Sequence, residues 1–150
     1  MDTKNQKERS RNMSLIRSKN TGPEMFIRKK LFSMGYRYRT CVKSLPGTPD
    51  LFFKKYNAVV MVNGCFWHGH ANCLKSSLPS TNRGFWIDKI EKNKKRDAQV
   101  IGQLLSLGLR IAVVWTCMLT NKSKREKTVD ILNAWLRSDE SFIEIPKTAT

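Results

Sequence analysis

Apolar positions recur with two different spacings along the chain, and each spacing predicts its own kind of element. Four apolar residues at helical spacing predict a first helix: Phe26, Ile27, Leu31 and Met34. Thr21 can cap this helix, Glu24 stands three residues later as in a capping box, and Gly35 ends it. From the residue pattern alone, a capping role at the start of the helix is sufficient to explain why an acidic residue stands at position 24.

Stretches of β-forming residues follow this helix, separated by turn residues. Residues 36–42 alternate and predict a strand, residues 44–49 carry Pro and Gly and predict a turn, and residues 50–53 resume as a strand. Residues 54–57 predict a hairpin turn into residues 58–62, whose unbroken apolar run is typical of a buried strand.

A long helical pattern and another apolar run come next. Residues 85–107 predict one helix, ended by Gly108, and residues 109–115 predict a second buried strand. The apolar positions of the helix are Trp86, Ile90, Val100, Ile101, Leu104 and Leu105. Because a helix connects the two buried strands, we expect residues 58–62 and 109–115 to lie parallel and side by side.

The pattern weakens toward the end of the chain. Residues 118–127 predict a basic loop, and residues 128–136 predict a closing C-terminal helix. The inward residues of that helix are Val129, Leu132, Trp135 and Leu136. A chain of 150 residues suits one domain. We expect an α/β domain at residues 21–137, a basic arm at residues 1–20 and a tail of weak character at residues 138–150.

The charge balance indicates a partner. The formal net charge is +16, and a charge of this size favours a polyanion such as nucleic acid. A merely soluble basic protein is the alternative, and the four Trp and seven Phe argue against it. Five cations crowd the long helix and favour phosphate contacts over a solvated face: Lys89, Lys92, Lys94, Lys95 and Arg96. The arm with Arg11 can equally be a DNA contact or a disordered terminus.

The first ten residues are polar and charged, and no apolar run approaches the length of a membrane span. We therefore expect no signal peptide, no membrane segment and a cytoplasmic location. In that setting, the four cysteines favour a metal site over disulfides. Cys41 stands apart from the others and is interpreted as a core or strand residue.

Residues 64–73 contain two cysteines, both histidines of the chain and two large aromatic residues. Thiolate and imidazole ligands at this density are typical of a zinc site, and a loop with buried thiols is the alternative. The candidate ligands are Cys65, His70 and Cys73 from one turn, with Cys117 as the fourth. Four protein ligands fill a tetrahedron, so we expect structural zinc, with His68 left for chemistry.

Asp50 begins a predicted strand, and no other Asp or Glu stands between it and Asp88. A lone carboxylate at a strand edge can bind Mg²⁺ together with phosphate oxygens and water. An aspartate after Pro49 can also simply cap a turn. On the residues alone these two interpretations are even.

Several spaced motifs resemble those of the very-short-patch repair (Vsr) DNA mismatch endonucleases. They are Pro49-Asp50, NGCFWHGH at residues 63–70, FWxxKIxxNxxRD at residues 85–97 and Trp115-x-Cys117. The match runs in order from about Arg9 to Leu136. The resemblance implies a restriction-endonuclease-like core with the order helix, three strands, helix, strand.

The resemblance also implies a function. A nuclease of this family binds double-stranded DNA as a monomer and finds a T:G mismatch, the product of deaminating 5-methylcytosine. It nicks the strand that carries the thymine, on the 5′ side of that base, and so initiates very short patch repair. A bacterial cytoplasmic protein at the nucleoid is therefore expected.

Individual residues take roles from the resemblance. Asp50 matches the catalytic aspartate that binds Mg²⁺, together with a main-chain carbonyl that would here belong to Val62. His68 matches the general base for the attacking water, and Glu24 matches an acidic residue near that water. The matched structural zinc ligands are Cys65, His70, Cys73 and Cys117. The matched aromatics that wedge into the base stack beside the mismatch are Phe66, Trp67 and Trp86.

The sequence departs from the family pattern in three places. Asn63 stands where some relatives have a histidine, and the spacing from His70 to Cys73 differs by one residue from that in some members, which leaves the choice of His70 open. No lysine stands where many restriction nucleases place one.

Two other functions fit many of the same features. One is a Vsr-like nuclease that acts on matched DNA in restriction or defence, and the other is a non-catalytic, zinc-stabilised module that binds nucleic acid. Only Asp50 and the unliganded His68 count against the second. Trp86 can also be a core residue, since it opens an amphipathic helix.

Overall fold

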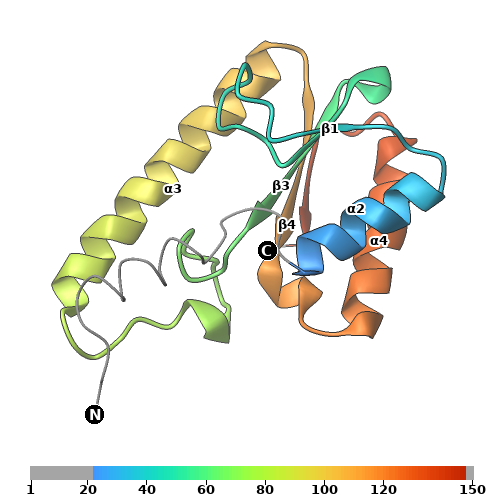
Figure 1. Ribbon diagram of the computed structural model, residues 1–150. Coiled ribbons are helices and arrows are strands. Elements are labelled where there is room, and N and C mark those ends of the chain that lie inside the picture. The colour runs from blue at the N-terminus through green and yellow to red at the C-terminus, as the bar shows by residue number, and fades with distance from the viewer. Residues whose placement is uncertain (1–21, 148–150) are drawn as a thin grey trace, which may run out of the picture.

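The computed structural model describes residues 22–147, which form a five-stranded sheet with helices on both faces (Figure 1). The basic arm predicted at residues 1–20, with Arg11, lies outside the described residues, and so does the helix cap at Thr21. Across residues 22–147, no helix combines the length and the apolar character needed to cross a membrane.

The elements come in the predicted order of helix, three strands, helix and strand, followed by one more helix and one more strand. The helices are α2 (Gly22–Ser33), α3 (Arg83–Ser106) and α4 (Lys122–Leu136). The strands are β1 (Arg39–Thr40), β2 (Leu51–Phe53), β3 (Ala58–Asn63), β4 (Arg110–Trp115) and β5 (Phe142–Ile145).

The strands lie in the order β1-β2-β3-β4-β5 across the sheet. β1, β2 and β3 are antiparallel neighbours, whereas β3, β4 and β5 are parallel. The predicted parallel pair with a helical crossover is confirmed, because α3 connects β3 to β4 and Asn63 lies opposite Trp115. The carboxyl ends of both strands therefore lie side by side at one end of the sheet, where the loop after β3 begins.

α2 and α4 cover one face of the sheet, and α3 covers the other (Figure 1). Successive residues of a strand point to opposite faces. Val60 accordingly packs in a cluster with Leu31 of α2 and Leu132 of α4, whereas Val59 packs in a cluster with Leu104 of α3. Burial on both faces explains why the two central strands read as continuous apolar runs.

The closing helix begins earlier than residue 128, where the apolar pattern placed its start. Asn121 caps α4 by accepting a hydrogen bond from the main-chain N–H of Lys124 at 2.8 Å. The first turns of α4 are polar, so their sequence looked like a basic loop. The four predicted inward residues are all buried, which confirms the packing face of this helix.

The C-terminal segment contains a strand that the hydrophobic pattern did not predict. β5 pairs with β4 in parallel register, and Ile143 and Ile145 are buried against α4. The interpretation of residues 138–150 as a tail of weak character was therefore wrong for residues 142–145. Two buried isoleucines give too short an alternation to be recognised alone.

Four smaller predictions were also wrong. Only Arg39–Thr40 of the strand expected at residues 36–42 pairs with β2. Cys41 is half-buried in a bend with φ of +50°, so it belongs neither to a strand nor to the core. Met34 lies just beyond the end of α2, and Leu105 lies to one side of the buried stripe of α3, so both side chains are exposed.

Candidate active site and metal centre

Asp50 lies immediately before β2 and reaches across to the end of β3. Its Oδ2 atom accepts a hydrogen bond from the main-chain N–H of Val62 at 2.7 Å. The pairing of β2 with β3 ends at Leu51 opposite Val60, so Val62 lies beyond the paired part of β2. The side chain of Asp50 takes the place of a strand partner there, and it fixes the carboxylate beside the main chain at the carboxyl end of β3.

The environment of Asp50 disfavours its charge. Burial raises the pKa of this carboxyl from 3.8 to about 6, the N–H of Val62 acts to lower it, and the nearby carboxylate of Glu24 acts to raise it. Glu24 is 2% exposed and comes from α2, on the other side of the sheet from α3. A pair of inward-facing carboxylates at this position is an environment that a cation would stabilise.

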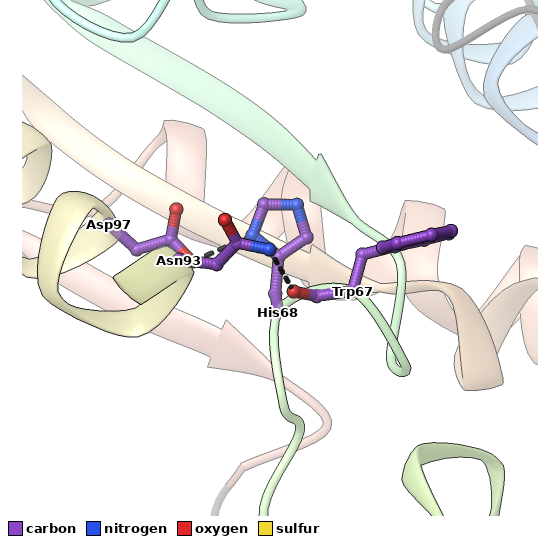
Figure 2. A network of polar contacts seen from close by, with 4 residues as sticks. All are labelled: Trp67, His68, Asn93 and Asp97. Atoms are coloured by element: carbon purple, nitrogen blue, oxygen red, sulfur yellow. Dashed lines mark hydrogen bonds and ion pairs between the residues drawn. The ribbon is translucent and has the colours of Figure 1, made fainter. Parts of the chain in front are cut away.

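His68 lies in the loop after β3, and its imidazole is held from α3 (Figure 2). Its Nδ1 atom lies 2.6 Å from Oδ2 of Asp97. A carboxylate at this position favours the tautomer with the proton on Nδ1, which leaves the lone pair of Nε2 to accept a proton. Sequence reasoning gave Asp97 no role, although it ends one of the quoted motifs. The sequence offered one signal for this role: Asp97 follows Asn93 by four residues in the same motif, so both side chains lie on one face of the helix.

One cavity of about 520 Å³ brings Asp50 and His68 together, whereas the third predicted catalytic residue, Glu24, is not among the residues that line it. Its lining includes Asp50, Val62, Asn63, His68, Lys89 and Arg96. Asn63 is 8% exposed, at the carboxyl end of β3. The cavity therefore combines a carboxylate, an imidazole and two cations, which is a combination suited to a phosphodiester.

The four predicted metal ligands converge. One ligand atom from each of Cys65, His70, Cys73 and Cys117 lies within 4.8 Å of the others. Nδ1 of His70 is 3.6 Å from Sγ of Cys117, so this nitrogen faces the cluster. The three thiols and one imidazole could hold a metal ion. Four ligands of this soft type are the set that a tetrahedral zinc site uses.

Neighbouring groups hold this cluster in place. The main-chain N–H of Cys117 donates to Sγ of Cys65 at 3.3 Å, and the hydroxyl of Thr116 donates to the same sulfur at 3.6 Å. The ring of His70 stacks on Trp115 with centroids 4.2 Å apart and planes 8° apart. The end of β4 thus orients two ligands from the loop after β3.

The acid–base properties of the cluster also favour a bound cation. Burial, together with the neighbouring thiols of Cys65 and Cys73, raises the pKa of the Cys117 thiol to about 12. Burial lowers the pKa of His70, against the opposing effect of the Glu144 carboxylate on β5. Three thiols this close cannot all ionise without a positive charge among them, whereas a neutral imidazole is ready to coordinate one.

The three predicted wedge residues form one aromatic group. Trp67 lies with its ring centroid 5.2 Å from that of Phe66 and 5.7 Å from that of Trp86. Trp67 is 50% exposed and Trp86 is half-buried outside both core clusters, so the core interpretation of Trp86 does not hold. Phe85, which sequence reasoning did not assign, extends the group 5.1 Å from Trp86 and is 61% exposed.

The five cations in the middle of α3, at residues 89–96, do not share one environment. Lys89 and Arg96 line the large cavity, and Lys92 forms an ion pair with Asp88 at 3.0 Å. Lys94 instead lies against Gly69 in the loop of residues 64–73, called the metal loop below because it carries three of the candidate ligands. Lys95 is exposed. Because a helix has about 3.6 residues per turn, neighbouring positions point in different directions around its axis. The cations therefore divide between the side that faces the cavity and the side that faces the metal loop.

The sequence is similar to a family model and to several known proteins. The family model described as DNA mismatch endonuclease Vsr matches residues 1–75. The DNA mismatch endonuclease Vsr of Escherichia coli is 34% identical over 146 residues, which cover 96% of this chain and 93% of that protein. The type II nicking enzyme V.NmeAIP of Neisseria meningitidis is 45% identical over 77% of this chain and 82% of its own. The type II nicking enzyme V.XorIIP of Xanthomonas oryzae is 47% identical over 73% and 79%.

Proposed function

The chain belongs to the Vsr family of DNA mismatch endonucleases, and on that premise we propose that it nicks double-stranded DNA at T:G mismatches. The nick falls on the 5′ side of the mismatched thymine and begins very short patch repair of deaminated 5-methylcytosine. The enzyme acts as a monomer on DNA and uses Mg²⁺ for catalysis and Zn²⁺ for structure.

The observation that carries this proposal is the shared cavity of Asp50 and His68. The two residues come from different parts of the chain, one before β2 and the other after β3. A DNA-binding module without catalysis has no need for a buried carboxylate and an imidazole around one hollow. The order of elements and the position of Asp50 beside β3 further support a restriction-endonuclease-like core.

The residues of the cavity divide the chemistry among themselves. Asp50 and the main-chain carbonyl of Val62 would hold Mg²⁺, with Glu24 adding negative charge nearby. When bound, the ion supplies positive charge at the attacked phosphate. Nε2 of His68 takes a proton from the attacking water as its oxygen bonds to phosphorus and one phosphorus–oxygen ester bond breaks. Asp97 keeps the imidazole oriented and stabilises it while it carries that proton.

The remaining features support binding and selectivity. Lys89 and Arg96 meet backbone phosphates beside the reacting group. Phe66, Trp67 and Trp86 insert beside the mismatch, where stacking is weakest, so unstacking costs least there. Zinc at the four-ligand cluster keeps the loop that carries His68 in place.

A related activity on matched DNA is the second candidate. Two relatives that are 45% and 47% identical are named type II nicking enzymes, a name that does not mention a mismatch. The same catalytic cavity would serve that reaction. The difference lies in whether the aromatic group enters a matched base step.

The deciding experiment uses duplexes that differ only in holding T:G or C:G at one position. With Mg²⁺, the proposal predicts a single nick 5′ of the thymine in the T:G duplex, an intact C:G duplex, and no nick after EDTA. Equal nicking of both duplexes would favour the matched-DNA activity. If the protein binds the T:G duplex tightly but nicks none of a panel of duplexes with different flanking sequences, it is a DNA-binding module without catalysis.

A further inference from the structure

α3 holds the loop after β3 by two hydrogen bonds that lie one helical turn apart (Figure 2). Nδ2 of Asn93 donates to the main-chain carbonyl of Trp67 at 2.8 Å. Oδ2 of Asp97 lies 2.6 Å from Nδ1 of His68. Residues four apart on a helix share one face, so two neighbouring residues of the loop are fixed to one side of α3.

The next loop residue is pressed against the same helix. Gly69 has φ of +61°, and a Cβ atom there would lie 2.5 Å from Cε of Lys94 and 2.6 Å from Cγ2 of Ile90. Only glycine allows this close approach in that conformation. The main chain at Gly69 therefore packs directly on side chains of α3, and the carbonyl of Trp67 is held by the side chain of Asn93.

The two fixed residues face different parts of the proposed substrate. Both line the cavity, but Trp67 is half-exposed and belongs to the aromatic group with Phe66 and Trp86, whereas His68 shares the cavity with the carboxylate of Asp50. They are consecutive in the chain, so a displacement of one main-chain unit displaces the other. Because one stiff helix holds both residues, the position of the wedge residue Trp67 and the position of the general base His68 are coupled.

We propose that Asn93 is a positioning residue, which by holding the carbonyl of Trp67 sets the place of His68 and couples wedge insertion to catalysis. This inference rests on the proposed function. A mismatch that admits the indole lets the loop keep its contacts with α3, and His68 then meets the water. A matched step that resists the indole pushes the loop off Asn93, and the base moves with it.

Direct contact of Asn93 with DNA is the competing explanation, because Asn93 also lines the cavity beside Lys89 and Arg96. The two explanations differ in protein that has no DNA bound. Only a positioning role changes the surroundings of His68 in the free enzyme. They also differ in kinetics, because a lost DNA contact weakens binding, whereas a misplaced base slows the reaction at saturating DNA.

The chain offers a clean probe, because it has two histidines, one in each site. In proton NMR spectra of the zinc-loaded enzyme without DNA, the imidazole signals of His68 report the cavity, and those of His70 report the metal centre. The variants are Asn93→Leu, which removes the donor at similar volume, and Asn93→Asp, which keeps the shape without the N–H. Gln99→Leu is the matched control, since it removes an exposed carboxamide from the same helix.

Both Asn93 variants should shift or broaden the His68 signals and leave those of His70 unchanged, as Gln99→Leu leaves both. Unchanged His68 signals, or equal changes at both histidines, would overturn the positioning role. This arm needs no substrate, so its result stands whether or not the wild-type enzyme nicks T:G duplexes.

Kinetics form the second arm. At saturating T:G duplex, Asn93→Leu should slow the single-turnover nicking rate about fivefold, as expected for one lost hydrogen bond, with an unchanged Kd for DNA. A raised Kd at an unchanged rate would assign Asn93 to DNA contact instead. The ratio of T:G to C:G nicking should fall in Asn93→Leu and in Trp67→Ala, and the double variant should fall no further than Trp67→Ala alone. Additive losses would contradict the coupling.

Discussion

The hydrogen bond from the N–H of Val62 to Oδ2 of Asp50 joins the start of β2 to the end of β3 over 2.7 Å. It brings a buried carboxylate to the carboxyl end of the central parallel strands, close to the loop that carries His68. It does so at an electrostatic cost, since burial outweighs this one donor and the carboxyl keeps a raised pKa. A cation bound beside Asp50, as proposed, would offset that cost by stabilising the ionised carboxylate.

Asp50→Asn should abolish nicking while leaving the fold intact. The amide oxygen can still accept from Val62, but it brings no negative charge to hold Mg²⁺. We expect the rate on T:G duplexes to fall by at least about 10²-fold, with DNA binding and zinc content unchanged. Nicking rate, fluorescence anisotropy with labelled duplex and metal analysis measure the three quantities. Substantial residual nicking would remove Asp50 from the mechanism.

The raised pKa of Asp50 also predicts how stability depends on pH in the absence of divalent cations. Below about pH 4 this carboxyl is protonated in both the folded and the unfolded chain, so it costs nothing. Between about pH 4 and 6 the carboxyl ionises in the unfolded chain but stays protonated in the folded one, so stability decreases as the pH rises, and the loss is complete once the pH has passed about 6. The upper limit of this loss is about 3 kcal/mol, from a shift of roughly two pKa units.

Asp50→Asn removes that titration, which gives the measurement its control. The variant and the wild type should have similar free energies of unfolding at low pH, and the variant should be the more stable of the two near neutral pH. Urea unfolding at several pH values in EDTA compares them. Curves that stay parallel across this range would show that the folded state does not disfavour the ionised carboxylate.

The convergence of the four candidate metal ligands could be predicted from the sequence because simple topology connects them. Two apolar runs joined by a helix lie parallel, so the loop after β3 and Cys117 after β4 must meet at one edge of the sheet. The same logic could not find Asp97, because its partner His68 lies in an irregular loop whose path no periodicity describes. Resemblance to a family assigned catalytic roles to Asp50 and Glu24, whereas the residues alone left Asp50 even between Mg²⁺ binding and a turn cap and favoured a helix cap for Glu24.

β5 shows a different limit of sequence pattern. A four-residue strand at the sheet edge carries two buried side chains, and its packing depends on α4 and β4 rather than on its own periodicity. The cations of α3 show a third limit. Their number was clear from the sequence, but Lys94 faces the metal loop because the loop rests on α3 at Gly69, a contact between residues 25 positions apart.

Removal of the metal should inactivate the enzyme through the loop rather than through the sheet. Cys65→Ser should lower the bound zinc by more than about tenfold, because one of four ligands is lost. Without the ion, the remaining ligand side chains are no longer joined to one another, so residues 64–73 loosen and release His68 from its place. We expect lost nicking and a lower Tm with most of the far-ultraviolet circular dichroism retained.

Cys41→Ser is the matched control for this experiment, because Cys41 lies outside the cluster. It should keep zinc content, nicking and Tm close to those of the wild type. Equal zinc loss in both variants would move the metal away from the predicted ligands. Full activity of Cys65→Ser without zinc would make the cluster dispensable.

Trp67→Ala should separate binding of the mismatch from stability. The indole is half-exposed, so its removal should change the free energy of unfolding by less than about 1 kcal/mol. Loss of base stacking is worth roughly 1–3 kcal/mol, so selective nicking of T:G duplexes should fall about tenfold or more. Phe53→Ala is the contrasting variant, because Phe53 is fully buried and its loss should lower stability by about 3–5 kcal/mol. Unchanged selectivity in Trp67→Ala would exclude this side chain as the wedge.

The two surfaces of α3 predict different salt dependences of DNA binding. Lys89 lines the cavity beside Arg96, whereas Lys94 rests against the metal loop at Gly69. If each phosphate contact releases about one counterion, Lys89→Gln should reduce the slope of log K against log salt concentration by about one. Lys94→Gln carries the same change of charge on the same helix and should leave the slope nearly unchanged. Anisotropy titrations from low to moderate salt measure both, and equal slopes for the two variants would mean that α3 meets DNA through its overall charge rather than through one face.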